Sequence, residues 1–240
     1  MPTTTSSRAR NRWAGVSPAD RRVERRALLL DAAFELLGTE GSARTTVRAV
    51  CARARLNPRY FYESFTDLDE LIVAVYDRLV DELTDAVVTT MDVAPGDPRS
   101  QTRAAIEQIV GFVDEDRRRG RVLYVEALDN AALNRRRFET GHTLADIVAL
   151  YAAERFGAPP DGEQIGRVGA TILVGGFSEL LIGWLDGRIE LTREQLVDDA
   201  TALFLALGET AAAIAAGRAD HAGTARPADT PKSVAQERDR

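Results

Sequence analysis

Apolar residues recur every three to four positions along most of this chain, which is the spacing of helices that bury one face. The first apolar row consists of Val23, Ala27, Leu30, Phe34 and Leu37. Ser17 followed by Pro18 is typical of a helix start, because serine caps free backbone amides and proline suits the first turn. Gly38 and Gly41 are expected to end this helix.

Two short helices are predicted next. Thr45 is expected to cap the second helix, and the apolar pattern is interrupted at 55–57. Asn57 and Pro58 then form another cap-and-proline start, for a third helix that runs to about Ser64. Three short helices with a tight turn between the second and the third are the pattern of a helix-turn-helix.

The remainder of the chain also has a helical pattern. Further helices are predicted at about 66–91, 100–119, 122–128, 131–156, 163–185 and 192–217. A break is expected at Gly120, and Gln195 is placed to complete a capping box with Thr192. No strand pattern stands out, so the chain is predicted to be all-α with about nine helices.

These elements divide the chain into four parts. A helix-turn-helix domain is expected at 17–65 and a larger helical domain at 66–217. The segment 1–16 is interpreted as a flexible basic arm, and 218–240 as a disordered tail, because both are polar and lack a helical period.

Charge is distributed unevenly along the chain. Residues 1–65 contain 12 Arg and 6 acidic residues, although the whole protein has a net charge of −6. A basic first part on an acidic remainder points to a polyanionic partner at one end, although each charge could also simply solvate a helix face.

The side chains of the predicted third helix suit DNA. The N-terminal residues of such a helix meet base edges in the major groove. Arg59 can donate two hydrogen bonds to a guanine or to a phosphate, and Tyr60 offers a ring for a thymine methyl group and a hydroxyl. Tyr62 is expected to face the DNA backbone, whereas Phe61 and Phe65, four residues apart, are assigned to the core. The candidate DNA-binding residues are Arg22, Arg44, Thr45, Thr46, Arg48, Arg55, Asn57, Pro58, Arg59, Tyr60 and Tyr62.

Residues 22–79 resemble the DNA-binding domain of TetR-type (TetR/AcrR) transcriptional regulators. The matching elements are Leu30–Ala33, Glu40-Gly41, Thr46-Val47, Phe61-Tyr62, Phe65 and Leu71. Four positions depart from the family pattern. Arg55 replaces the turn glycine, Arg59 replaces a small residue, Ser64 replaces a histidine, and Leu68 replaces a lysine that contacts phosphate. These departures affect the expected operator rather than the fold.

The resemblance implies a homodimer that binds double-stranded DNA and responds to a small-molecule ligand. The last two helices would form the dimer interface, for which the candidates are Ile172, Gly176, Leu180, Leu196, Ala200, Leu203 and Leu207. A ligand cavity is expected in the larger domain, for which the candidates are Phe112, Tyr124, Glu126, His142, Tyr151, Phe177 and Trp184. The expected function is a repressor that a small molecule releases from a near-palindromic operator.

No catalytic residues, cofactor or metal site are predicted. The sequence lacks a phosphate-binding loop, a zinc-protease motif, a nucleophile elbow and a dinucleotide glycine pattern. Cys51 is the sole cysteine, and no secretory signal or membrane-length apolar run is evident, so a cytoplasmic protein without membrane association is expected. The alternative is an adaptor or enzyme of the same helical fold that does not bind DNA.

Overall fold

The computed structural model describes residues 17–156 and 163–224, and these residues are helical throughout apart from short connections. The helices are α1 (Pro18–Glu40), α2 (Val47–Ala54), α3 (Pro58–Tyr62), α4 (Leu68–Val93), α5 (Pro98–Glu115), α6 (Arg117–Gly120), α7 (Glu126–Asp129), α8 (Ala131–Phe156), α9 (Glu163–Leu185) and α10 (Arg193–Thr224). A 3-10 turn, η1 (Ser42–Arg44), follows α1, and a π-helical turn, η2 (Arg121–Val125), joins α6 to α7. Because α6, η2 and α7 are continuous, the described chain forms nine helical stretches, and the predicted fold class is confirmed.

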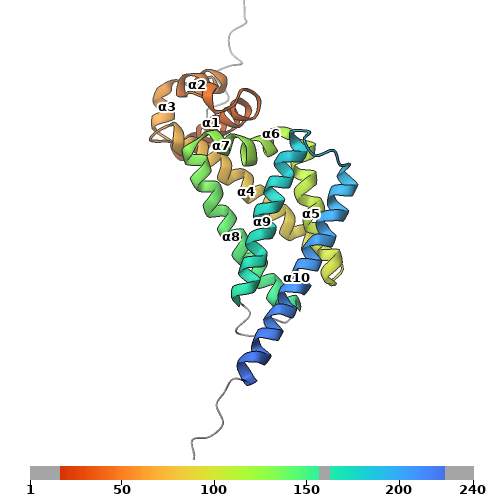
Figure 1. The fold of residues 1–240 in the computed structure, drawn as a ribbon. Helices are drawn as coiled ribbons and strands as arrows, with labels where there is room; N and C mark the ends of the chain where they lie inside the picture. Colours follow the sequence, from red (N-terminus) through yellow and green to blue (C-terminus); the bar gives the residue numbers. More distant parts are fainter. Residues whose placement is uncertain (1–16, 157–162, 225–240) are drawn as a thin grey trace, which may run out of the picture.

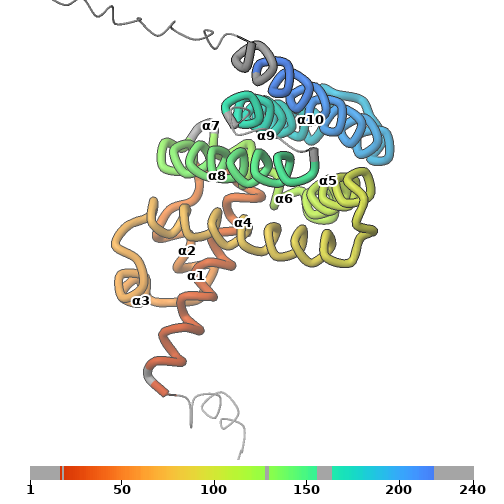
Figure 2. The backbone as a smooth tube through the Cα atoms, turned by 90° about the horizontal axis from the view of Figure 1, so that it is seen from below, coloured from red at the N-terminus to blue at the C-terminus, as the bar shows by residue number. Residues whose placement is uncertain are grey.

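Helices α1 to α3 form a head at one end of a body of long helices (Figure 1). In the body, α8 and α5 lie between α4 on one side and the α9–α10 pair on the other (Figure 2). Helix α4 contacts α1 in the head and both α5 and α8 in the body. It is therefore the long element shared by the two parts.

One hydrophobic core runs from the head into the body. The fully buried residues include Leu29, Leu37, Val50 and Phe61 in the head and Leu71 near the start of α4. Phe61 is the largest of these side chains, and its burial holds the short helix α3 against its neighbours.

The buried face of α1 differs from the predicted one. Its buried hydrophobic side chains are Leu29, Ala32, Ala33, Leu36 and Leu37, all in the second half of the helix. Val23 and Ala27 are exposed, and Leu30 and Phe34 are half-buried. The predicted row was therefore wrong at its start, because the N-terminal half of α1 has apolar residues but extends beyond the helices that would cover them.

Several helix ends match the sequence and others do not. The side chain of Ser17 accepts a hydrogen bond from the Asp20 amide at 3.1 Å, and Thr192 and Gln195 form the reciprocal capping box. The predicted cap at Thr45 is wrong, since Thr46 caps α2 by accepting from the Ala49 amide.

The predicted break at Gly120 is also wrong. The chain turns at Asp116, which has an extended backbone and caps α6, and the helix continues through Gly120. Gly120 is buried, and a Cβ atom there would lie 2.5 Å from Cδ1 of Leu185. This glycine allows α6 to approach α9 closely and does not end a helix.

The predicted terminal segments lie largely outside the described residues. The arm at 1–16 and residues 225–240 of the tail are not among the residues that the structure describes. The tail prediction is wrong for 218–224, because α10 continues to Thr224.

Helices α9 and α10 are long and apolar enough to span a membrane by length and composition alone. Much of their surface is uncovered in the single chain. Core helices of water-soluble proteins meet the same criteria, so this observation is weak evidence for a membrane.

Candidate DNA-binding interface

The turn between α2 and α3 has an unusual residue in the left-handed conformation. Arg55 has φ 55° and ψ 40°, and it is the one non-glycine residue with positive φ in 17–156 and 163–224. The turn thus keeps the conformation that glycine would adopt in the family pattern. The left-handed region costs a non-glycine residue about 1 kcal/mol or more, so Arg55 is held there by the surrounding structure.

Helix α3 is short and begins with a well-defined cap. The side chain of Asn57 accepts a hydrogen bond from the Arg59 amide at 2.9 Å, and Pro58 follows in the first turn. Asn57 and Pro58 are themselves exposed. They set where α3 starts and therefore which residues occupy its first turn.

The aromatic residues of α3 divide between core and surface. Phe61 and Phe65 are buried with ring centroids 5.8 Å apart, which confirms their assignment to the core. Tyr62 is 63% exposed and packs its ring edge against Phe61. Tyr60 is half-buried, since the guanidinium of Arg25 lies 4.4 Å from its ring centroid.

Arg59 is the most prominent polar side chain of α3. Its side chain is 80% exposed, and its Nε donates to Oε1 of Glu63 at 3.1 Å. Oε2 of the same carboxylate accepts from Arg25 of α1 at 3.3 Å. Sequence reasoning missed Glu63 and its contact with Arg25. The i,i+4 spacing of Arg59 and Glu63 was a usable signal, whereas the contact with α1 required the tertiary structure.

The start of α2 offers a second group of polar side chains. Thr46, Arg44 and Arg48 are exposed at this helix end, as is Arg22 on α1. The prediction that Thr45 contacts DNA is corrected here, because its side chain is buried and its hydroxyl donates to the Gly41 carbonyl at 2.9 Å. It shapes the loop before α2 and has no surface to offer to a phosphate.

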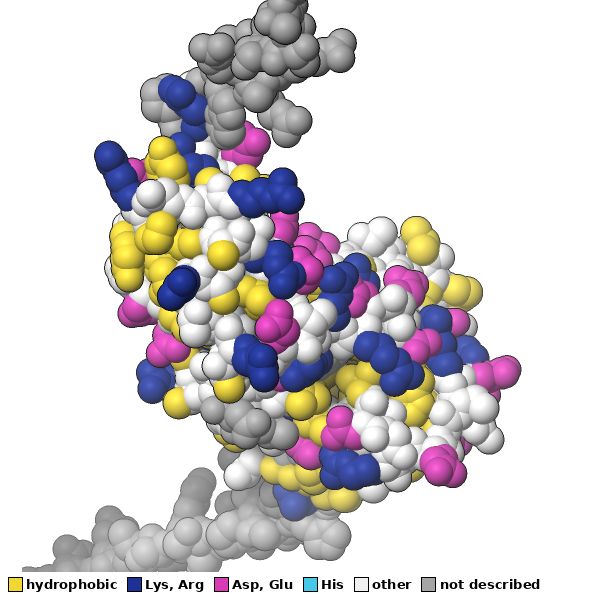
Figure 3. Space-filling view, turned by 90° about the horizontal axis from the view of Figure 1, so that it is seen from above, with side chains coloured by type: hydrophobic (Ala, Val, Ile, Leu, Met, Phe, Trp, Pro, Cys, Tyr) yellow, Lys and Arg dark blue, Asp and Glu magenta, His cyan; other side chains and the backbone are white. Residues whose placement is uncertain are grey.

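Basic, acidic and apolar side chains all lie on the surface seen from above (Figure 3). Arg53 is neutralised by Glu35 and Glu40, so it contributes less positive charge than its position on α2 suggests. The arginines without an acidic partner within 17–156 and 163–224 include Arg22, Arg44, Arg48 and Arg55. These four belong to the predicted DNA-binding set.

The head is joined to the body by a polar junction. The Glu126 carboxylate is nearly fully buried and accepts from the Ser42 amide at 2.6 Å and from Arg121 Nε at 2.8 Å. Arg121 also donates to the Thr39 carbonyl at 3.1 Å. The prediction that Glu126 lines a ligand cavity is therefore corrected, because both oxygens are used to connect η2 and α7 to the loop before α2.

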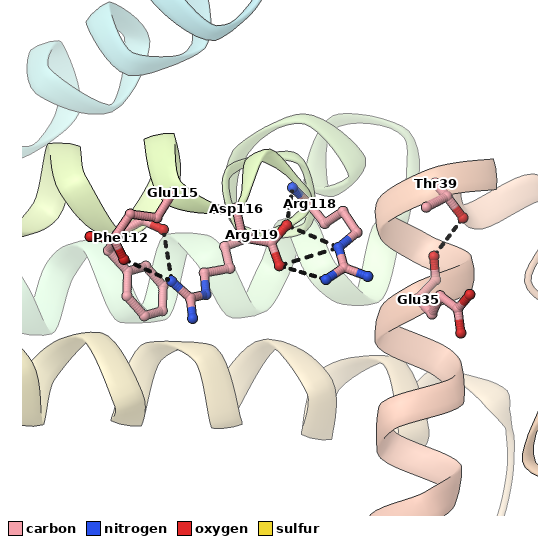
Figure 4. Close-up of polar contacts among 7 residues, drawn as sticks. All are labelled: Glu35, Thr39, Phe112, Glu115, Asp116, Arg118 and Arg119. Carbon is pink, nitrogen blue, oxygen red and sulfur yellow. Dashed lines mark hydrogen bonds and ion pairs between the residues drawn. The ribbon is translucent and has the colours of Figure 1, made fainter.

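A second part of this junction lies where α5 turns into α6 (Figure 4). The Arg118 guanidinium donates to both oxygens of Asp116, and this hydrogen bonding lowers the pKa of the carboxyl. Arg118 also lies 5.0 Å from the ring centroid of Phe34 on α1. Helix α6 thus contacts α1 through a side chain whose position is set by the α5–α6 turn.

The other candidate ligand-binding residues do not converge on one described cavity. His142 is exposed and bonds to the Phe138 carbonyl, so its assignment to an interior cavity is corrected. Tyr151 donates to Gln101, and the indole of Trp184 donates to the Leu191 carbonyl. Phe112 is buried beside Arg119, while Phe177 packs edge-on against Phe204.

Tyr124 differs from those residues. It belongs to the π-helical turn η2 and packs against the core, and burial strongly raises the pKa of its hydroxyl. Its side chain nevertheless keeps some accessible surface. It lies in the same helical stretch as Arg121 and Glu126 of the polar junction.

The predicted dimer residues fall into two groups. Ile172 and Leu203 are 59% and 66% exposed, Gly176 is exposed, and Leu180 and Leu207 are half-buried. Leu196 and Ala200 are buried within the subunit, so their assignment to the dimer interface is corrected. One helix carries apolar residues on two faces, and sequence periodicity alone does not say which face the subunit itself covers.

The fold and the interface define a class of protein: a helix-turn-helix head carried on an all-helical body. Residues 29–75 match the family model described as bacterial regulatory proteins, tetR family. The head therefore contains a TetR-type DNA-binding domain, and the whole chain has the fold of TetR-type transcriptional regulators.

Solved structures agree with this assignment. A TetR-like transcriptional regulator from a Rhodococcus species is 26% identical, with a TM-score of 0.59 over 75% of this chain and 93% of the other. A transcriptional regulator from Pseudomonas aeruginosa is 18% identical, with a TM-score of 0.65 over 85% and 98%. The fatty acid degradation regulator FadR from Bacillus halodurans is 15% identical, with a TM-score of 0.61 over 75% and 94%. The last two likenesses concern the fold. The sequence matches no curated protein.

Proposed function

We propose that this regulator is a cytoplasmic homodimeric repressor that binds a near-palindromic operator and is released from it by a small molecule. The observation that carries the proposal is the exposed first turn of α3. Its start is defined by the Asn57 cap, and Arg59 projects from it into solvent. Repression, rather than activation, is carried over from the resemblance to the family.

The head offers side chains for contacts to base edges and for contacts to phosphates. Arg59 and Tyr60 stand where base edges are read, while Thr46, Arg48 and Tyr62 are exposed at positions suited to phosphates. Arg55, on the turn between the two helices, adds a positive charge where the family pattern has glycine. This charge compensates for the lysine that Leu68 replaces.

A homodimer is supported by the uncovered faces of α9 and α10. Val168, Ile172, Leu203 and Ile214 are large apolar side chains exposed on these two helices. A second copy of the chain would bury them against the same surface patch of its partner, as a two-fold interface requires. Two heads would then read two half-sites of one operator.

A ligand response is supported by the polar junction between body and head. A molecule that binds near Tyr124 and displaces η2 would also displace Arg121 and Glu126, and through them the loop before α2. The DNA affinity would fall only as far as the ligand prefers the displaced conformation, typically about 1–3 kcal/mol.

Selection of DNA from a random-sequence library with the full-length protein tests the proposal. We expect an enriched sequence with two related half-sites, bound by two chains, with an affinity that falls steeply as salt rises. Arg59→Ala should weaken binding to the selected sequence much more than Arg99→Ala, a matched change of an exposed arginine at the start of α5. A folded dimer that enriches no sequence would contradict the proposal and favour the adaptor function.

A further inference from the structure

We infer that Glu63 is a positioning residue that orients Arg59 for base reading and makes the protein more selective at the expense of affinity. This inference rests on the proposed DNA-binding function. It adds a specificity-determining role for an acidic side chain on a surface that must approach a polyanion.

The geometry places Glu63 between two arginines. Its Oε1 accepts from Nε of Arg59 at 3.1 Å, and its Oε2 accepts from Arg25 at 3.3 Å. The side chain of Arg25 is only 18% exposed and lies against the Tyr60 ring. The well-packed side chain of Arg25 therefore holds Glu63 from the α1 side. Glu63 in turn restricts the side chain of Arg59.

The bond from Nε leaves the outer end of Arg59 available. Its two terminal amino groups make no hydrogen bond to any residue in 17–156 or 163–224. The edge formed by these two groups can donate two hydrogen bonds to O6 and N7 of guanine. Glu63 thus restricts the rotamers of a long exposed side chain without occupying the groups that read a base.

The same carboxylate also opposes unspecific binding. An arginine without a partner can turn to any nearby phosphate, and such contacts carry no sequence information. A negative charge beside Arg59 repels phosphates and disfavours those alternatives, which lowers the affinity for every sequence but penalises incorrect ones more. We expect Glu63 to raise the ratio between specific and unspecific affinity.

The test compares the full-length wild type with Glu63→Gln on the DNA that the wild type selects. Binding is measured by fluorescence anisotropy on that sequence and on each single-base variant of it. Arg59→Ala identifies the base pairs that Arg59 reads. At those base pairs Glu63→Gln should reduce discrimination by about fivefold or more, while affinity for a shuffled sequence rises. In the Arg59→Ala background, Glu63→Gln should leave discrimination at those base pairs unchanged.

Glu40→Gln is the matched control, since Glu40 is an acidic partner of Arg53 in the same head and lies at the end of α1. It should leave base discrimination unchanged. Glu63→Asp keeps the charge but shortens the reach, so it should lose discrimination even if the glutamine variant does not fold. Equal discrimination by wild type and folded Glu63→Gln or Glu63→Asp would overturn the inference. If the wild type selects no sequence, it is the proposed function that fails.

Discussion

The carboxylate of Glu126 accepts a hydrogen bond from the backbone amide of Ser42 at 2.6 Å, and so joins the body to the segment that leads into α2. Arg121 binds the same carboxylate and also reaches the Thr39 carbonyl at the end of α1. Two residues of one helical stretch therefore hold the loop that orients the helix-turn-helix. These hydrogen bonds connect η2 and α7 directly to the head.

Removing the Glu126 carboxylate should destabilise the protein. Glu126→Ala leaves the Ser42 amide and the Arg121 guanidinium without their partner in a nearly buried site, which costs about 1–3 kcal/mol. The free energy of unfolding is measured by urea denaturation. Glu139→Ala is the control, because Glu139 is exposed in its ion pair with Arg136, and it should change stability by about 0.5 kcal/mol or less. Equal effects of the two variants would count against a structural role for the junction.

Relieving the backbone strain at Arg55 should stabilise the fold. Arg55→Gly removes the penalty of the left-handed conformation and should raise the free energy of unfolding by about 1 kcal/mol. Arg55→Ala removes the same charge but keeps a Cβ atom, so it should bring no such gain. In both variants the slope of log affinity against log salt concentration should become less steep, by the amount expected for the loss of about one phosphate contact. A glycine variant no more stable than the alanine variant would show that the turn is not strained.

Placing a charge on the uncovered face of α10 should prevent dimer formation. Leu203→Glu changes a side chain that is 66% exposed in the single chain, so the subunit should stay folded while its dimer dissociates. Val93→Glu, at an exposed site at the end of α4, is the control and should leave the dimer intact. Sedimentation velocity gives the mass in solution. A Leu203→Glu dimer as strong as the wild type would place the interface elsewhere.

The close approach of α1 and α6 should not tolerate a larger residue at Gly38. A Cβ atom there would lie 2.5 Å from Cβ of Arg118 and 3.2 Å from its Cα, so the two helices would have to separate. Gly38→Ala should therefore cost about 1–3 kcal/mol of stability. Gly141 lies in α8, and a Cβ atom there would have no neighbouring atom within 4 Å. Gly141→Ala should therefore stabilise that helix by about 0.5–1 kcal/mol. Thermal unfolding of the two variants checks the opposite signs.

The ion pair of Asp116 and Arg118 should make part of the stability depend on pH. The folded pKa of Asp116 is lowered chiefly by its hydrogen bond with Arg118, so the pair stabilises the protein above the unfolded pKa of about 4. This stability is lost as the pH falls through the lower, folded pKa. Asp116→Asn keeps a good helix cap but removes the charge. It should therefore destabilise the protein at pH 7 more than at pH 3, and an equal loss at both would contradict this assignment.

The sequence predicted those features that depend on neighbouring residues. The caps at Ser17, Asn57 and Thr192 follow from side chains that reach amides two or three residues away, and the structure confirms them. The division between buried Phe61 and exposed Tyr62 follows from their adjacent positions on one helix. The resemblance, carried by many such positions, predicted the head and its family.

Features that depend on contacts between distant segments were not predicted from the sequence. The role of Glu126 was missed because its partner, Ser42, lies 84 residues away. Gly120 has the pattern of a helix end, and only the side chain of Leu185 on α9 shows that it permits close packing instead. Glu63 could be paired with Arg59 by spacing, but its anchor, Arg25, is supplied by another helix.

The sequence by itself determined that this protein is all-helical, where most helices begin, and that its first part is a helix-turn-helix of the TetR type. These properties arise from backbone capping, from the helical period and from local side-chain chemistry, which act over a few residues. The tertiary structure alone decided which apolar face of α1 and α10 is covered, which acidic residue joins head to body, and which residue of α1 holds the Glu63 partner of Arg59. Burial and ion pairing are set by segments that meet only when the chain folds, and no local pattern encodes them.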